Sequence, residues 1–190
     1  MPVPAPTSFG SLTLSPATDR VDLLAGPVAL VLAAHPDLAA VTAVTEIDPA
    51  LSDTPALVAA TSIPAEGCAN CVVVSGRRDG QERIAACVLL ATTRADVNGA
   101  VKRLIDVRKA SFLSMDRAVA ETGMEYGGIT PIGLPAGWRL LIDARVAEAG
   151  DVMIGSGVRR SKLILPGRTL AGLAGAVVVE NLAVPAPTAG

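Results

Sequence analysis

The feature that most constrains the fold is a pair of β-rich runs separated by a turn signal in the middle of the chain. The runs "CVVVS" (71–75) and "RIAACVLLAT" (83–92) flank "GRRDGQE", in which Asp79-Gly80 is a dipeptide typical of hairpin turns. The second run is apolar at successive positions, as expected of a strand covered on both faces. The sequence therefore predicts a local β-hairpin whose second strand lies inside a sheet.

Start and stop signals predict helices elsewhere in the chain. One helix is expected after Pro27, one over "TPALVAAT" with Ser52 or Asp53 as its cap, one opened by a Thr93–Asp96 capping box and running toward Arg108, and one from Ser114 to Gly123.

Further β-rich runs with Gly and Pro punctuation are "AVTAVTEI", "WRLLID", "DVMIG", "KLILP" and "AVVVEN". Because strands outnumber helices and the hairpins are local, we expect one α+β domain with a mixed, largely antiparallel and barrel-like sheet flanked by helices. We place this domain at residues 14–182. Its Pro/Ala/Thr-rich neighbours, residues 1–13 and 183–190, are expected to be flexible tails.

Charge and hydropathy exclude several classes of partner. Sixteen basic and eighteen acidic side chains give a net charge of −2, so no global field attracts DNA, and a polyanion would have to meet a local patch. No uncharged apolar run approaches the roughly 18 residues that span a bilayer. The N-terminus has neither the basic start nor the apolar region of a secretory signal. We expect a cytoplasmic protein without membrane partners.

Cys68 and Cys71 in "EGCANCVVV" raise the possibility of a metal or redox site. A structural zinc site needs four ligands, and only Cys87 and His35 remain to complete it. A redox-active pair belongs at a helix N-terminus, whereas this pair runs into a β-rich segment. We therefore expect buried packing cysteines, with no metal and no cofactor. A thiol oxidoreductase using Cys68 and Cys71 is kept as a third functional hypothesis.

Two glycine-containing segments carry the remaining candidates. In "TGMEYGGITPIG" (122–133), Gly127 and Gly128 permit unusual backbone angles, and Pro131 stiffens the exit. Such a loop can bring backbone N–H groups close to a ligand carbonyl, although by composition alone a tight structural turn is the better explanation. The segment "GSGVRRSKL" (155–163) places three cations near a kink, as phosphate contacts or as a solvated strand face: Arg159, Arg160 and Lys162.

The run "TGMEYGGITPIGLPAGWRLLIDARV…VMIGSGVRRSKLILPGRTL" resembles the YbaK/prolyl-tRNA synthetase-associated editing domain family, over roughly Pro49 to Val179. The most specific part is the Gly-x-x-x-Pro loop from Gly127 to Pro131, preceded by Thr122-Gly123. Members are small α+β domains that hydrolyse mischarged aminoacyl-tRNAs, either fused to a synthetase or free-standing. The resemblance implies a deacylase acting in trans on the 3′ acceptor end of an aminoacyl-tRNA that carries a small amino acid. It leaves an aminoacyl-tRNA synthetase open as a partner.

The resemblance also implies site residues. The backbone at Gly127 and Gly128 would cradle the aminoacyl group, and the substrate-binding set would comprise Thr122, Gly123, Ile129, Thr130, Pro131, Gly155, Ser156 and Gly157. An aminoacyl ester is already activated and its ribose hydroxyl can assist cleavage, so positioning and oxyanion contacts suffice.

Asn70 departs from the family pattern, in which a lysine commonly stands at the start of this strand. Asn donates and accepts hydrogen bonds but carries no charge. Asn70 either replaces charge with hydrogen bonds, or is assisted by a cation such as Arg160 or Lys162, or marks a domain that binds without hydrolysing. The last case is the alternative function, a non-catalytic module for an aminoacyl or nucleotide end. A purely structural Asn70 would cap the turn before the strand.

Overall fold

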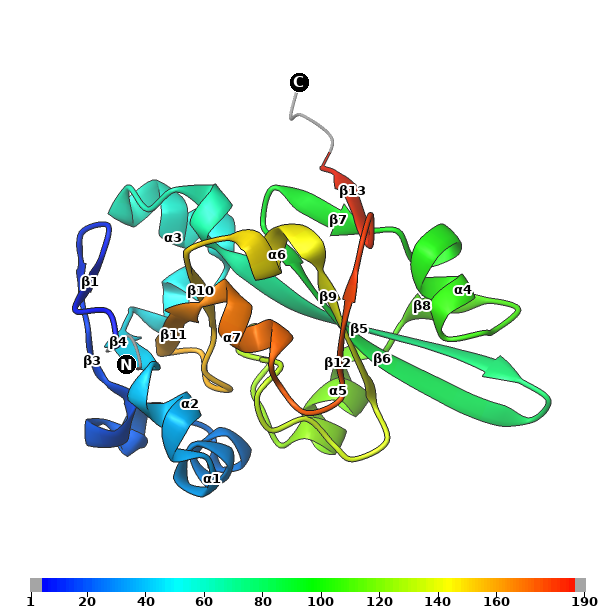
Figure 1. Cartoon of the computed structure of the whole chain (residues 1–190), viewed down its shortest axis with the longest axis horizontal. Coiled ribbons are helices and arrows are strands. Elements are labelled where there is room, and N and C mark those ends of the chain that lie inside the picture. Colours follow the sequence, from blue (N-terminus) through cyan, green and yellow to red (C-terminus); the bar gives the residue numbers. More distant parts are fainter. Residues whose placement is uncertain (1–4, 187–190) are drawn as a thin grey trace.

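Two β-sheets form the body of the protein, and most of their strands coincide with the predicted β-rich runs (Figure 1). The computed structural model describes residues 5–186. The five-stranded sheet has the order β12 (Ala176–Val179), β9 (Arg139–Asp143), β6 (Gln81–Leu90), β5 (Ala69–Arg78), β8 (Ala110–Phe112). The four-stranded sheet has the order β10 (Asp151–Gly155), β11 (Ser161–Pro166), β4 (Ala43–Glu46), β3 (Ser15–Pro16).

The predicted hairpin is confirmed. Strands β5 and β6 pair antiparallel from Arg78↔Gln81 at the turn to Ala69↔Leu90 at the base. Asp79 and Gly80 both have positive φ, +51° and +79°, as a two-residue hairpin turn of type I′ requires. The middle of β6 is buried and has a strand on each side, as its continuous apolar run predicts.

The five-stranded sheet is more mixed than predicted, and the barrel-like closure is wrong. β9 runs parallel to both β6 and β12. Within residues 5–186 the two sheets share one isolated parallel bridge, Cys68↔Met153, instead of a continuous ladder. The ladder ends at this bridge, and the same edge of β5 is next occupied, at Val74–Gly76, by β8.

Helices cover both sheets, and three of the four predicted helices form at the expected places. The helices are α1 (Gly26–Ala34), α2 (Pro36–Ala40), α3 (Thr54–Thr61), α4 (Lys102–Leu104), α5 (Met115–Thr122), α6 (Ala144–Glu148) and α7 (Gly167–Ala171). Short 3₁₀ turns lie at Ala17–Asp19 (η1), Val21–Leu23 (η2), Pro49–Leu51 (η3) and Ala65–Gly67 (η4). No helix among the described residues is long and apolar enough to cross a bilayer.

The predicted Thr93–Asp96 capping box is wrong. Thr93 begins strand β7 (Thr93–Ala95), and its hydroxyl donates to the Leu90 carbonyl. Asp96 is itself the cap: its carboxylate accepts from the N–H groups of Gly99 and Ala100, and a π-helical turn, η5 (Val97–Val101), leads into α4. The helix ends well before Arg108.

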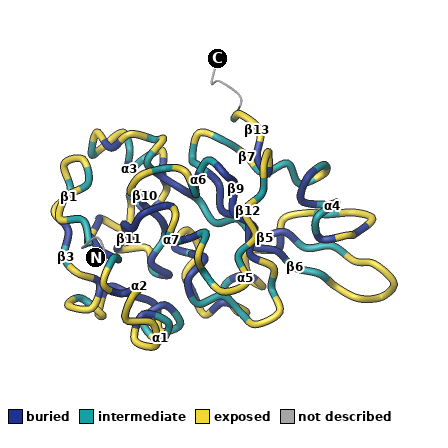
Figure 2. The backbone as a smooth tube through the Cα atoms, viewed as in Figure 1, coloured by how far each residue is buried: buried dark blue, intermediate teal, exposed yellow. Residues whose placement is uncertain are grey.

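The core lies between the two sheets and their helices. Buried backbone concentrates in the sheet centres, whereas the far end of the β5–β6 hairpin is exposed (Figure 2). The largest cluster joins α1, α6 and α7 to both sheets through apolar side chains such as Val28, Val146, Leu163 and Leu170. The hairpin therefore projects beyond the packed body (Figure 1).

Ordered pairing extends past both predicted domain limits. β1 (Ser8–Phe9) and β2 (Leu12–Thr13) form a small hairpin, and β13 (Ala183–Pro185) pairs with β7. The limits at residues 14 and 182 and the flexibility of the tails stay predictions. Their outermost parts, residues 1–4 and 187–190, lie outside the described residues.

Candidate active site

A gap in the edge of β5 opens into a cavity of about 710 Å³. One edge of β5 pairs with β6 along its whole length. The other edge bridges to β10 just before the strand, at Cys68, and pairs with β8 only from Val74 onward. Residues 69–72 lie between these two contacts and line the cavity, as does Val73, whose carbonyl accepts from the Leu113 N–H at 2.9 Å. The cavity therefore begins where the sheet has no neighbouring strand.

Asn70, Gly155 and Lys162 reach this cavity from three different strands. The parallel bridge sets Cys68 beside Met153, and Asn70 and Gly155 follow two residues later on their strands. Gly155 is in turn paired with Lys162 across β10 and β11. The topology explains why residues so far apart in the sequence line one cavity.

Three hydrogen bonds from cavity residues hold the segment from Pro49 to Thr54, which forms an adjoining wall of the cavity. The Asn70 Oδ1 accepts from the Thr54 hydroxyl at 2.9 Å. The Lys162 ammonium donates to the Ser52 carbonyl at 2.7 Å, and the Arg159 guanidinium donates to the Pro49 carbonyl at 3.2 Å. Asn70 therefore holds the start of α3 instead of capping the turn before its own strand.

Lys162 is a buried cation, with 5% of its surface exposed. Burial lowers the pKa of its ammonium below the usual 10.5, and the nearby Arg159 adds to this, whereas Cys68 and Asp53 oppose it. An ammonium has three N–H donors, and within the described residues only the Ser52 carbonyl accepts from it. Two donors thus remain for a ligand, in a site where charge is weakly screened.

The glycine loop presents Gly127 to the cavity but not Gly128. Gly128 is buried, and its N–H donates to the Glu125 carbonyl at 2.9 Å. Its carbonyl accepts from Gly157 N–H at 2.8 Å, which ties the loop to the segment after β10. The N–H groups of Gly127 and Ile129 have no partner within residues 5–186, and both residues line the cavity. Oxyanion contacts can therefore come from Gly127 or Ile129, whereas Gly128 sets the loop position.

Most other predicted binding residues serve the structure around the cavity. The Thr122 hydroxyl donates to the Ala118 carbonyl, and Gly123 closes α5 with φ +66°. Ser156 and Ser161 share a buried hydroxyl contact at 2.7 Å. Gly157 is packed against Ala25, since an added Cβ there would lie 2.3 Å from the Ala25 Cβ. None of these residues lines the cavity.

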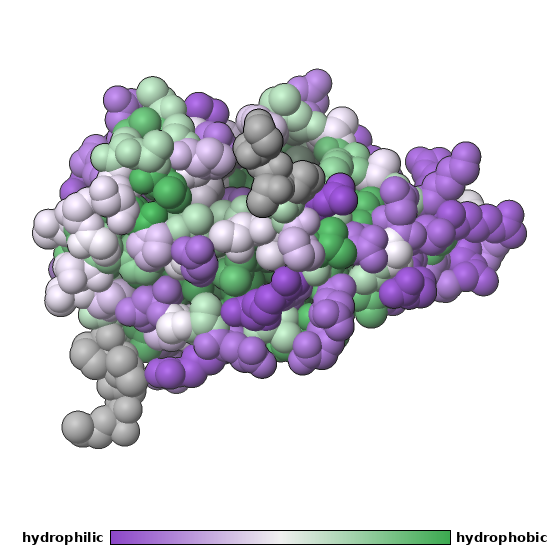
Figure 3. Space-filling model, turned by 90° about the horizontal axis from the view of Figure 1, so that it is seen from above, coloured by the Kyte–Doolittle hydropathy of each residue, from purple (hydrophilic) through white to green (hydrophobic). Residues whose placement is uncertain are grey.

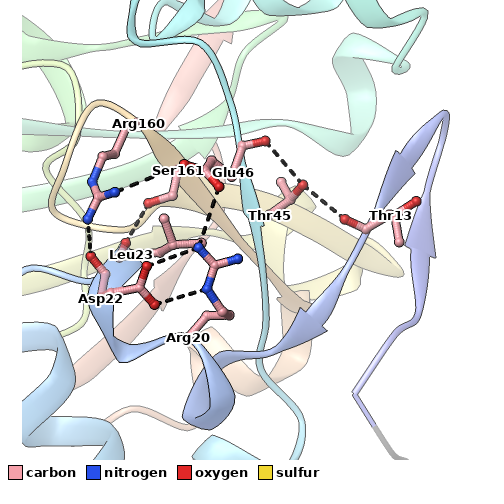
Figure 4. A network of polar contacts seen from close by, with 8 residues as sticks. All are labelled: Thr13, Arg20, Asp22, Leu23, Thr45, Glu46, Arg160 and Ser161. Carbon is pink, nitrogen blue, oxygen red and sulfur yellow. Dashed lines mark hydrogen bonds and ion pairs between the residues drawn. The ribbon is translucent and has the colours of Figure 1, made fainter.

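Thr130, Pro131 and Arg160 also lie away from the cavity. Thr130 is fully buried, and its hydroxyl has no partner within the described residues. Pro131 lines a second cavity of about 1030 Å³, on the side of α2 and Trp138. Arg160 turns toward the Asp22 carbonyl and Glu46, in the polar network of Figure 4. Arg159 and Lys162, but not Arg160, are thus the predicted cations at the cavity.

The expectation that the cysteines pack in the core is confirmed. Cys68 and Cys87 are buried, and Cys71 is half-buried. Burial raises the pKa of Cys68 to about 11 and of Cys87 to about 12. Cys68 and Cys71 are three positions apart in extended chain, or about 10 Å, beyond disulfide reach. The geometry argues against thiol redox chemistry. Within residues 5–186 no three His, Cys, Asp or Glu side chains cluster as metal ligands.

Sequence reasoning missed the apolar side of the cavity. It is formed by Phe112 and Leu113 at the end of β8, Met115 and Ala118 of α5, and Tyr126 of the glycine loop. Phe112, Met115 and Tyr126 are all more than half exposed, at 61%, 51% and 54%. Phe112 and Tyr126 are two of only four aromatic residues in the chain. Their scarcity was the one sequence signal that could have pointed to the apolar side of the cavity.

These features define an α+β domain with one polar and one apolar cavity wall. A family model described as "Aminoacyl-tRNA editing domain" matches residues 48–173, more than half of the chain. The protein belongs to this family, which confirms the resemblance inferred from the glycine loop. Among curated proteins, none matches the chain.

Two of the matching solved structures illustrate the shared fold. "Hypothetical protein APE2540" superposes with a TM-score of 0.71 at 20% identity, covering 83% of this chain and 99% of its own. A "putative trans-editing enzyme for prolyl tRNA synthetase" superposes with a TM-score of 0.68 at 19% identity, covering 87% of this chain and 96% of its own. At these identities the likeness establishes the fold.

Proposed function

We propose that the protein is an aminoacyl-tRNA deacylase that acts in trans in the cytoplasm and hydrolyses the ester of a tRNA mischarged with a small amino acid. The observation that carries the proposal is one cavity lined by Asn70, Gly127 and the buried Lys162. Membership of the editing-domain family supplies the reaction class, and the description of one structural neighbour as a trans-editing enzyme supports action in trans.

In the proposed reaction the ester carbonyl lies against the glycine loop. Water adds to the carbonyl carbon, the ribose oxygen leaves with the bonding electrons and takes up a proton, and the free amino acid departs. The Gly127 N–H, which has no partner within the described residues, donates to the developing oxyanion. A single donor of this kind typically contributes about 10²–10³ in rate. Lys162 and the Asn70 amide hold the terminal nucleotide through a phosphate or a ribose hydroxyl.

The test is release of amino acid from a panel of tRNAs, each mischarged with a small amino acid, relative to buffer. The wild type is expected to hydrolyse at least one ester, and Gly127→Ala to do so at least about tenfold more slowly. In that variant a Cβ would enter the cavity 3.5 Å from the Ser52 hydroxyl and 3.4 Å from the Arg159 guanidinium. Equal rates for the two proteins would contradict the role given to the loop.

The second candidate is a module that binds an aminoacyl or nucleotide end without hydrolysis. It is favoured by the neutral Asn70 at the position where the resemblance implies a lysine, and by the use of its Oδ1 to hold Thr54. The distinguishing measurement is calorimetry with a non-hydrolysable aminoacyl-adenosine analogue. Binding of the analogue together with no turnover of any ester in the panel would establish the module instead of the enzyme.

A further inference from the structure

Basic side chains are concentrated at one end of the molecule. Residues 77–109 hold eight of the sixteen basic residues of the chain but only four of the eighteen acidic ones. This segment includes the end of the β5–β6 hairpin, α4 and the approach to β8 (Figure 1). The corresponding end of the space-filling view is strongly hydrophilic (Figure 3). A protein of net charge −2 therefore carries a local positive region.

Most of these cations form no ion pair within residues 5–186. Arg78 pairs with Asp79 and Asp106, and Arg83 pairs with Asp106, so two carboxylates neutralise these two cations locally. Arg94 is unpaired among the described residues but lies apart, on β7. The remaining set consists of Arg77, Lys102, Arg103, Arg108 and Lys109, and we call it the basic surface. All of its members except the half-buried Lys102 are exposed, so they are available to an external polyanion.

The basic surface is continuous with the cavity. Arg108 and Lys109 lead directly into β8, whose last residue, Phe112, lines the cavity. β8 pairs with β5 through Gly76↔Ala110, so the next residue of β5, Arg77, comes beside Lys109. The approach is close, because a Cβ at Gly76 would lie 2.4 Å from the Lys109 carbonyl oxygen.

The transition from charge to aromatic surface follows one strand. In extended chain the three residues from Lys109 to Phe112 span about 10 Å. Phe112 is 61% exposed at the cavity mouth, where a flat ring is available to an unpaired base. Cations that can bind phosphates are followed here by an aromatic ring on which a base can stack. This order suits a nucleic acid whose backbone lies outside the cavity while its single-stranded end enters the cavity.

We propose that the basic surface binds the phosphates of the tRNA acceptor stem and directs the unpaired 3′ end past Phe112 into the cavity. The inference rests on the proposed function for the identity of the ligand as tRNA. It assigns stem binding to the β8 edge and the hairpin, and not to the cations at the cavity, of which Lys162 is buried.

The experiment measures binding of uncharged tRNA by fluorescence anisotropy across a range of salt concentrations. The test variant is Arg108→Glu/Lys109→Glu, in which both positions are exposed. The control is Arg168→Glu, an exposed cation in α7 without an ion pair in the described chain. The double variant is expected to weaken binding about tenfold or more at low salt. It should also flatten the slope of log K against log salt by about 0.7–0.9 for each phosphate that the protein no longer neutralises.

Equal affinity and equal salt slope for the double variant and Arg168→Glu would overturn the proposal. The deacylase assignment can be contradicted independently of the basic surface. If the wild type hydrolyses no ester but its tRNA binding still depends on Arg108 and Lys109, the role of the basic surface is supported and the deacylase proposal is contradicted. If the wild type hydrolyses an ester while the double variant binds tRNA unchanged, the deacylase proposal is supported and the role of the basic surface is contradicted.

Discussion

Gly127 and Gly128 are neighbours in sequence, but the structure requires glycine at each for a different reason. Gly127 has φ +84°, a conformation that costs other L-residues about 1–2 kcal/mol. At Gly128 an added Cβ would lie 2.8 Å from the Val158 carbonyl, so the backbone itself would have to move. Sequence alone shows two permissive residues and does not distinguish the strained one from the crowded one.

We predict that Gly128→Ala lowers the free energy of unfolding by about 1–3 kcal/mol, because it overpacks two backbone segments. Gly150→Ala is the control for glycine replacement without crowding, since Gly150, like Gly128, has no positive φ but has open space around its Cβ position. Urea denaturation of both variants provides the measurement. A Gly128→Ala protein as stable as the wild type would show that the loop tolerates a side chain there.

Lys162 was one of three neighbouring cations that the sequence could not separate. Arg159 and Arg160 adjoin each other, yet one faces the cavity and the other the Asp22 and Glu46 network. Lys162 is buried because β11 is covered on both faces, so that every residue of this strand is buried. The sequence shows that three cations lie close together along the chain, whereas the arrangement of the strands decides which of them line the cavity.

At the scale of elements, Asp143 joins three of them. It ends β9, its carboxylate accepts from the Arg145 N–H at the start of α6, and it accepts from the Ala183 N–H of β13 at 3.0 Å. The Arg145 guanidinium also donates to it at 2.7 Å. Burial alone would raise the pKa of Asp143, but these hydrogen bonds outweigh it and the pKa lies below the ordinary 3.8.

We predict that Asp143→Asn lowers the free energy of unfolding by about 1.5–3 kcal/mol at pH 7, because charge-assisted hydrogen bonds are removed. The folded-state pKa is below the unfolded one, so this contribution is complete above about pH 4 and disappears as the pH falls through the folded value. Urea titrations at pH 7 and pH 3 measure both effects, with exposed Asp151→Asn as control. A difference from wild type that is independent of pH would contradict the linkage.

Local signals predicted elements well and failed where partners are distant. Asp79-Gly80 specified the hairpin turn, and Gly123 the end of α5, because both depend on neighbouring residues alone. The Thr93 cap failed because β7 pairs with β13, about ninety positions later, and this pairing takes Thr93 into a strand. The parallel course of β9 beside β6 was likewise hidden, since nothing in either run specifies the partner.

At the scale of the whole molecule, the site arises from how two sheets meet. The edge of β5 is left open at residues 69–72, between the single bridge to β10 and the contacts with β8 and Leu113. The glycine loop and the Pro49–Thr54 segment enclose this opening. No residue pattern encodes such a gap, whereas resemblance to the family drew attention to Asn70 and the loop, which both line it. The barrel expected from the sequence would have closed the edge on which the cavity depends.

The central claim is that Asn70 and Lys162 together replace the lysine that the resemblance implies at position 70. The most direct test is the single-turnover rate of ester hydrolysis for the wild type, Lys162→Met and Asn70→Lys on the preferred mischarged tRNA. The wild type is predicted to be active and Lys162→Met at least about tenfold slower. Asn70→Lys is predicted not to exceed the wild type, because it adds a further cation to a cavity that already holds Arg159 and Lys162 and removes the acceptor of Thr54. An inactive wild type activated by Asn70→Lys, or equal rates for the wild type and Lys162→Met, would contradict the claim.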